Sequence, residues 1–127
     1  MSQVPIIAIV DDDESVRLAT ESLMRSFGFR TNIFASAESF LNSSTLPDTD
    51  CLITDVQMPN MGGLELHEVL RARGAALPVI FMTAFPEEQV RRRAQEVRAV
   101  GFLAKPFDGD AIMSLVFEAL KNPSQAP

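Results

Sequence analysis

The hydrophobic residues of this chain fall into short unbroken runs. Three of them, residues 6–10, 51–54 and 79–82, are apolar almost throughout rather than alternating with polar residues. Unbroken apolar runs of this length are typical of strands that are covered on both faces in a parallel sheet. Residues 31–34 and 102–103 predict two further, shorter strands.

Between these runs, apolar residues recur at helical spacing. In the first such segment we expect Val16, Ala19, Leu23 and Phe27 to face the core, with Gly28 as a left-handed cap. Four further helices are predicted. The first is short and capped by Ser36, and the second follows Gly63 with Leu66, Val69 and Leu70 facing the core. The third has Pro86 in its first turn and Val90, Ala94 and Val97 facing the core, and the last is capped by Asp108, with Phe107 packed on Ile112.

Five strands that each precede a helix predict an α/β fold with a doubly wound, five-stranded parallel sheet. A chain of 127 residues is long enough for one such domain. We assign residues 1–121 to this domain and interpret residues 122–127 as a tail or the start of a linker, because they are rich in proline and polar residues.

Polar residues with strong chemistry follow four of the strands. Asp11 and Asp12 end the first, Asp55 the third, Thr83 the fourth and Lys105 the fifth. In doubly wound sheets, ligands bind beyond the carboxyl ends of the strands, where the strand order reverses. These five residues are therefore expected to share one pocket, although each alone could equally serve as a turn or helix-cap residue.

Acids gathered in one pocket need a proton or a cation, since unpaired carboxylates repel one another. An all-oxygen cluster with room for water suits Mg²⁺, or Mn²⁺ in its place. With that ion, a lysine and a hydroxyl nearby, Asp55 could attack a phosphoryl group and form an acyl phosphate. The methionines and the single histidine, His67, are interpreted as packing or surface residues.

Composition narrows the classes of function. The formal charge of −6 and the pI of about 4.7 argue against direct binding of nucleic acid. The single cysteine, Cys51, lies in an apolar run and is expected to be a buried thiol. Neither a basic leader nor a membrane-length apolar stretch is evident, so we expect a cytoplasmic protein.

Across residues 4–121 the sequence resembles the receiver domain of bacterial two-component response regulators, and most of all the FixJ-like regulators that carry a LuxR-type DNA-binding domain. The resemblance lies in the acids Asp11 and Asp12 after the first strand, and in the segments Asp55-x-x-Met-Pro-x-Met-x-Gly, Met82-Thr-Ala and Phe102-Leu-Ala-Lys-Pro-Phe. It implies a flavodoxin-like (βα)5 fold with strand order 2-1-3-4-5.

The resemblance also implies a role for each residue. Asp55 would be the phosphoacceptor. Asp12, Asp55 and the main-chain carbonyl of Gln57 would hold the metal, with Asp11 acting through its bound water. The remaining implied roles are phosphoryl contacts from Thr83 and Lys105, a switch formed by Thr83 and Phe102, and a cis peptide bond before Pro106.

Two positions depart from the family pattern. Phe102 replaces a common tyrosine, so it could swing inward but could not hydrogen-bond outward. Arg98 replaces the glycine that usually eases a left-handed helix end. Together with Arg91, Arg92 and Arg93 it gives this face positive charge, which Asp108, Asp110 and Glu118 could complement in a dimer; a merely solvated helix face is the alternative.

We therefore expect a signalling switch rather than an enzyme. It would take a phosphoryl group from a sensor histidine kinase, lose it slowly, and change its dimer or effector contacts. A separate C-terminal DNA-binding output domain would control transcription. The alternatives are a small Mg²⁺-dependent phosphohydrolase with Asp55 as nucleophile, and a protein-binding module that works without phosphorylation.

Overall fold

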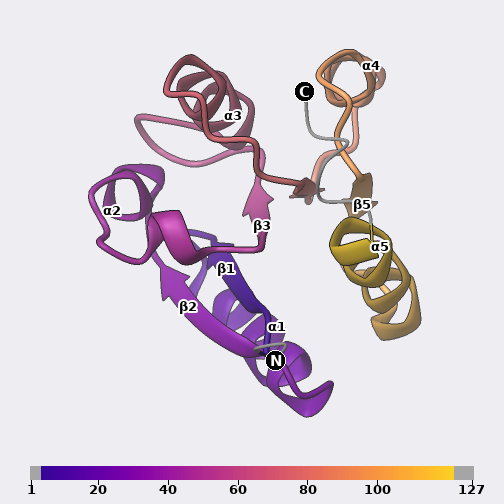
Figure 1. Cartoon of the computed structure of the whole chain (residues 1–127). Helices are drawn as coiled ribbons and strands as arrows, with labels where there is room; N and C mark the ends of the chain where they lie inside the picture. The colour runs from indigo at the N-terminus through magenta and orange to yellow at the C-terminus, as the bar shows by residue number, and fades with distance from the viewer. Residues whose placement is uncertain (1–3, 122–127) are drawn as a thin grey trace.

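The computed structural model describes residues 4–121, in which strands and helices alternate along the chain (Figure 1). The strands are β1 (Ile6–Val10), β2 (Arg30–Phe34), β3 (Cys51–Asp55), β4 (Val79–Thr83) and β5 (Gly101–Ala104). The helices are α1 (Glu14–Ser26), α2 (Ala37–Leu41), the 3-10 turn η1 (Leu46–Asp48), α3 (Gly63–Ala72), α4 (Glu88–Glu96) and α5 (Gly109–Lys121).

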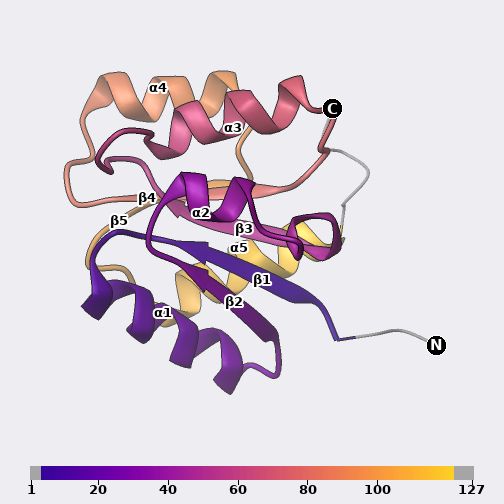
Figure 2. The same ribbon diagram turned by 90° about the vertical axis from the view of Figure 1, so that its left-hand side faces the viewer.

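All four strand pairs are parallel, and the sheet order is β2-β1-β3-β4-β5. This confirms the predicted doubly wound fold and its strand order. Helices α1 and α5 cover one face of the sheet, whereas α2, α3 and α4 cover the other (Figure 2). The chain changes face after β2, so the connections that leave β1 and β3 run to opposite faces of the sheet. The strand order reverses between β1 and β3, which places the loop after β1 next to the loop after β3.

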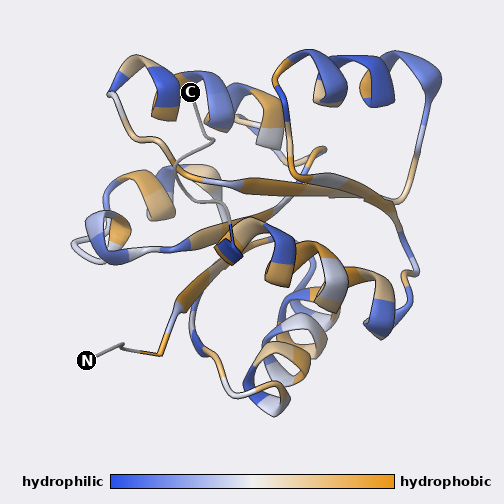
Figure 3. Cartoon of the chain, turned by 45° about the vertical axis from the view of Figure 1, so that its right-hand side comes forward, coloured by the Kyte–Doolittle hydropathy of each residue, from blue (hydrophilic) through white to orange (hydrophobic). Residues whose placement is uncertain are grey.

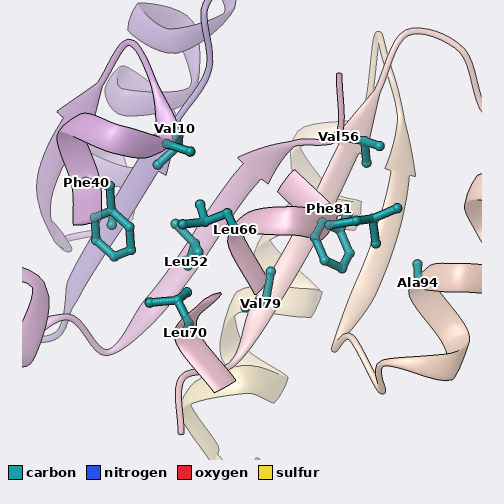
Figure 4. Packing of buried hydrophobic residues seen from close by; sticks show 12 residues of the cluster. Val10, Phe40, Leu52, Val56, Leu66, Leu70, Val79, Phe81 and Ala94 are labelled. Atoms are coloured by element: carbon teal, nitrogen blue, oxygen red, sulfur yellow. The ribbon is translucent and has the colours of Figure 1, made fainter. Parts of the chain in front are cut away.

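Successive strand residues point to opposite faces, so the sheet separates two cores. On the α2–α4 side, Leu52 and Phe81 pack with Phe40 and Leu66 (Figure 4). On the α1–α5 side the neighbouring residues of the same strands, Ile53 among them, form a second cluster. The hydrophobic colour in Figure 3 accordingly lies along the strands and on the inner turns of the helices. Burial on both faces explains the unbroken apolar runs.

Cys51 is fully buried in the second cluster, as its place in an apolar run predicts. Burial, followed by the charge of Asp50, raises the pKa of its thiol to about 12. The thiol is therefore protonated at neutral pH and packs as a small apolar group.

Two local predictions were wrong. In α1, Ala19 is exposed, whereas Thr20 and Met24 are buried. Thr20 is tolerated inside because its hydroxyl donates a 2.7 Å hydrogen bond to the carbonyl of Val16. Pro86 was expected in the first turn of α4, but the helix begins at Glu88 because Glu87 still has an extended backbone.

Other residues predicted to mark the ends of helices are confirmed. Gly28 has φ of +93° after α1, and Ser36 caps α2 by accepting a hydrogen bond from the amide of Ser39. Phe107 belongs to the same cluster as Ile112. None of the helices in the described part of the chain is both long and apolar enough to cross a membrane.

Candidate functional site

The five residues predicted to share a pocket follow strand ends at one edge of the sheet. Asp55 and Thr83 are the last residues of β3 and β4, and Asp11 and Lys105 directly follow β1 and β5. Carboxylate oxygens of Asp11, Asp12 and Asp55 all lie within 4.8 Å of one another. The parallel topology thus assembles an acidic cluster from segments that are far apart in the sequence.

Glycines let the loop after β3 close tightly beneath this cluster. A Cβ atom on Gly63 would collide with the main-chain carbonyl of Asp55, and one on Gly62 with that of Val56. The amide of Gly63 instead donates a 3.0 Å hydrogen bond to the Val56 carbonyl. The Glu65 side chain accepts from the amide of Gly62 and so caps the start of α3. This packing holds Asp55 at the pocket edge.

Lys105 joins two of the acids. Its Nζ lies 2.8 Å from Oδ2 of Asp11 and 3.2 Å from Oδ2 of Asp55. Burial alone would lower the pKa of Lys105, but the hydrogen bond and charge of Asp11, followed by those of Asp55, raise it above its usual value. The ammonium group is therefore charged at neutral pH. Asp11 is completely buried, and its Oδ1 accepts a 2.9 Å hydrogen bond from the amide of Asp13.

The carboxylate of Asp55 is only partly compensated by its surroundings. Burial and then the charge of Asp11 raise its pKa above the usual value, although Lys105 and the amide of Gln57 act in the opposite direction. That amide donates to Oδ1 of Asp55 over 3.3 Å. A carboxylate whose charge is only partly balanced gains from a further cation or from a polar group attached to it.

The donor set fits a divalent cation with hard oxygen ligands. Three carboxylates with one ammonium group leave two negative charges without compensation. Asp12 is exposed, so the cluster faces water and leaves room for the water ligands that Mg²⁺ retains. Metal ligation by Asp12, Asp55 and the Gln57 carbonyl, with Asp11 acting through water, stays a prediction.

The hydroxyl of Thr83 is hydrogen-bonded to Gln57 and Phe85 rather than to the acids in this structure. Its fully buried side chain donates a 2.8 Å hydrogen bond to Oε1 of Gln57 and accepts one of 3.0 Å from the amide of Phe85. Sequence reasoning assigned Gln57 only a main-chain role and did not foresee this side-chain contact. No sequence pattern signals it, since it joins the end of β4 to the loop after β3, which meet only in the folded chain.

Phe102, the predicted switch aromatic, is half-buried in β5. The guanidinium carbon of Arg91 lies 5.3 Å from the centroid of its ring, within the range of a cation–π interaction. The peptide bond between Lys105 and Pro106 is cis.

Another contact that sequence reasoning missed is the 2.7 Å hydrogen bond from Arg17 to the main-chain carbonyl of Asp11.

Comparisons with known proteins agree with this geometry. Residues 7–117 match the model of the response regulator receiver domain family. Among curated proteins, the transcriptional regulatory protein FixJ of Azorhizobium caulinodans is 39% identical over 114 residues, which cover 90% of this chain and 54% of that protein. The response regulator protein TmoT of Ectopseudomonas mendocina is 38% identical over 119 residues, which cover 94% of this chain and 54% of TmoT.

Solved structures show the same likeness. Response regulator StyR superposes with a TM-score of 0.87 and 35% identity, covering 97% of this chain and 62% of StyR. The structure of FixJ-N gives a TM-score of 0.84 and 32% identity, covering 94% of this chain and 96% of that one. The chain thus spans about half the length of the curated relatives that it matches.

Proposed function

This chain belongs to the family of response regulator receiver domains, a family of signalling modules rather than a classical enzyme family, and we propose that it accepts a phosphoryl group on Asp55 from a partner histidine kinase. The observation that supports this most directly is the position of Asp55. Its carboxylate ends β3 inside an acidic cluster, 3.2 Å from the ammonium group of Lys105.

In the proposed transfer, a carboxylate oxygen of Asp55 attacks phosphorus. An oxygen–phosphorus bond forms, the nitrogen–phosphorus bond of the kinase's phosphohistidine breaks, and the imidazole nitrogen keeps the electron pair. Lys105 stabilises the negative charge on the phosphoryl oxygens. When bound, Mg²⁺ supplies further charge neutralisation there. Asp12, Asp55 and the carbonyl of Gln57 would hold it, and Asp11 would support its water shell.

The domain would catalyse only this transfer and the slow hydrolysis of its own aspartyl phosphate. Lys105 already lies between Asp11 and Asp55, so it needs little movement to reach a phosphoryl oxygen. Thr83 has to exchange its hydrogen bond with Gln57 for one with the phosphoryl group. Phe102 would then turn inward into the space that Thr83 leaves, which breaks its contact with Arg91.

We place the output of this switch on the face formed by α4, β5 and α5, as a homodimer or effector contact. The exposed Arg91 of α4 lies on that face, over the ring of Phe102 in β5, and could meet the acids of α5 in a second copy. Arg92 is exposed as well, whereas Arg93 pairs with Glu68 of α3 over 3.3 Å and so lies toward that helix. The curated relatives are longer transcriptional regulators, so a C-terminal DNA-binding output domain is proposed for the whole protein. The predicted linker, residues 122–127, lies outside the described residues.

Beryllofluoride, which imitates a phosphoryl group on a carboxylate, tests both acceptor and metal. With Mg²⁺ it should perturb the amide resonances of residues 83–85 and 101–104, and it should shift the protein to a larger species in size-exclusion chromatography. The Asp55→Asn variant should not respond, and Asp12→Asn should need more Mg²⁺. Equal Mg²⁺ affinity of Asp12→Asn and parent would contradict the ligand assignment.

Two assays on the same protein distinguish the proposed function from the two alternatives. Turnover of an external phosphomonoester that depends on Mg²⁺ and Asp55 would favour the phosphohydrolase. A failure to bind Mg²⁺ and beryllofluoride, together with a stable fold, would favour the phosphorylation-independent binding module.

A further inference from the structure

A cavity of about 450 Å³ lies at the edge of the sheet opposite the acidic cluster. It opens where β4 and β5 begin, between the end of α3, the end of α4 and the last turns of α5. The parallel strands run from right to left in Figure 2. Asp55 ends β3, whereas the cavity lies where β4 and β5 begin, so the two lie at opposite ends of the strands. Its volume is in the range of sites for small organic ligands.

The lining of this cavity is partly cationic. Arg71 of α3 and Arg98 after α4 both line it, as does the acid Glu118 of α5. None of the three forms an ion pair within residues 4–121. His67 also lines the cavity, and burial followed by the charge of Arg71 lowers the pKa of its imidazole, so it is neutral at pH 7. The lining therefore carries an excess of one positive charge in a protein whose net charge is −6.

Arg98 occupies a backbone conformation that disfavours it. Its φ is +60°, in the left-handed region where residues other than glycine are uncommon. The described chain has only one other such non-glycine residue, Asn60, and asparagine tolerates the region well. Glycine at position 98 would avoid the strain but would remove a guanidinium group from the cavity rim. The left-handed residue ends α4, where the amide of Ala99 donates a 3.1 Å hydrogen bond to the carbonyl of Ala94, and an arginine in this position lines the cavity.

The other residues that line the cavity include apolar side chains, which restrict the kind of ligand that fits. Leu77, Val97 and Val100 give the cavity an apolar lining next to the two arginines. Guanidinium groups bind carboxylates through paired hydrogen bonds, and apolar walls favour a compact hydrocarbon group. We propose that this cavity binds a small organic carboxylate, with its charge toward Arg71 and Arg98 and its hydrocarbon body against the apolar wall.

The test uses the unphosphorylated chain and 3-methylbutanoate as probe, followed through backbone amide resonances. We expect saturable shifts at residues 75–79, 97–100 and 118–119, with a dissociation constant of about 1 mM or below. The neutral analogue 3-methylbutanamide has the same shape without the charge and should bind at least about tenfold more weakly. Inorganic phosphate, an anion without a hydrocarbon body, should also bind more weakly.

Two variants locate the site. Arg98→Gly should weaken probe binding about tenfold while relieving backbone strain, so loss of binding cannot be attributed to unfolding. Arg71→Gln should have a similar effect, whereas Arg92→Gln, on the exposed face of α4, should leave binding unchanged. Equal affinity for the acid and the amide, non-saturating shifts, or unchanged binding in Arg98→Gly would each overturn the proposal. Phosphorylation of Asp55 is measured separately, so either result stands independently of the proposed signalling function.

Discussion

The hydroxyl of Thr83 donates a 2.8 Å hydrogen bond to the side-chain oxygen of Gln57 rather than to the carboxylate of Asp55. If Thr83 is to reach a phosphoryl group on Asp55, this hydrogen bond has to break. Gln57 therefore stabilises the unphosphorylated arrangement. The size of this stabilisation is the net contribution of one hydrogen bond, about 0.5–1.5 kcal/mol.

Removing the acceptor should favour the activated state. We expect Gln57→Leu to bind beryllofluoride about two- to tenfold more tightly than the parent at saturating Mg²⁺, because no hydrogen bond is lost on activation. In a Thr83→Ala background the same substitution should have no such effect, which a double-mutant cycle measures. Tighter binding of the same size in both backgrounds would show that Gln57 acts by another route.

The ion pairs of Lys105 predict a stability that depends on metal. Lys105→Met leaves buried Asp11 without its partner and should lower the free energy of unfolding by about 3 kcal/mol in the absence of Mg²⁺. Saturating Mg²⁺ should recover part of the loss, because it neutralises the same carboxylates. Urea unfolding followed by circular dichroism measures both values. Lys121→Met, which removes an exposed lysine from the end of α5, is the matched control and should change little.

The left-handed backbone of Arg98 predicts a stabilising substitution. Arg98→Gly should raise the free energy of unfolding by about 1 kcal/mol, since glycine adopts a φ of +60° without steric cost. The same change at Arg92, inside α4, should lower it by about 0.5–1 kcal/mol. Thermal unfolding of the two variants should therefore move in opposite directions; a shared sign would contradict the interpretation of strain.

His67 predicts a pH dependence in the region of pH 5–7. Nδ1 of His67 is buried and has no hydrogen-bond partner among residues 4–121, and the pKa of the imidazole is lowered, first by burial and then by the charge of Arg71. As the pH falls below about 6.5, the unfolded chain takes up a proton that the folded chain resists, so stability decreases. The His67→Leu variant should lack this decrease in stability, so its free energy of unfolding at low pH should exceed that of the parent by up to about 1 kcal/mol. Parallel pH profiles for the two proteins would refute it.

Much of the fold and the site could be predicted because continuous apolar runs mark buried parallel strands. Once β1, β3, β4 and β5 are placed, the topology alone brings Asp11, Asp55 and Lys105 to one edge. The contact of Thr83 with Gln57 could not be predicted, because it depends on the loop geometry after two strands. In α1 the predicted inward residue Ala19 is exposed and Thr20 is buried instead, since its hydroxyl is hydrogen-bonded within the helix. Leu23 and Phe27 pack on the core as predicted.

Intact mass after incubation with Mg²⁺ and acetyl phosphate tests the central claim most directly, with Asp55→Asn alongside. The chain contains neither tryptophan nor tyrosine, so mass is a more direct readout than intrinsic fluorescence. We predict one added phosphoryl group on the parent, dependent on Mg²⁺, and none on Asp55→Asn. An adduct of equal yield on both proteins, or none on the parent even when beryllofluoride also fails to bind, would contradict Asp55 as the phosphoacceptor.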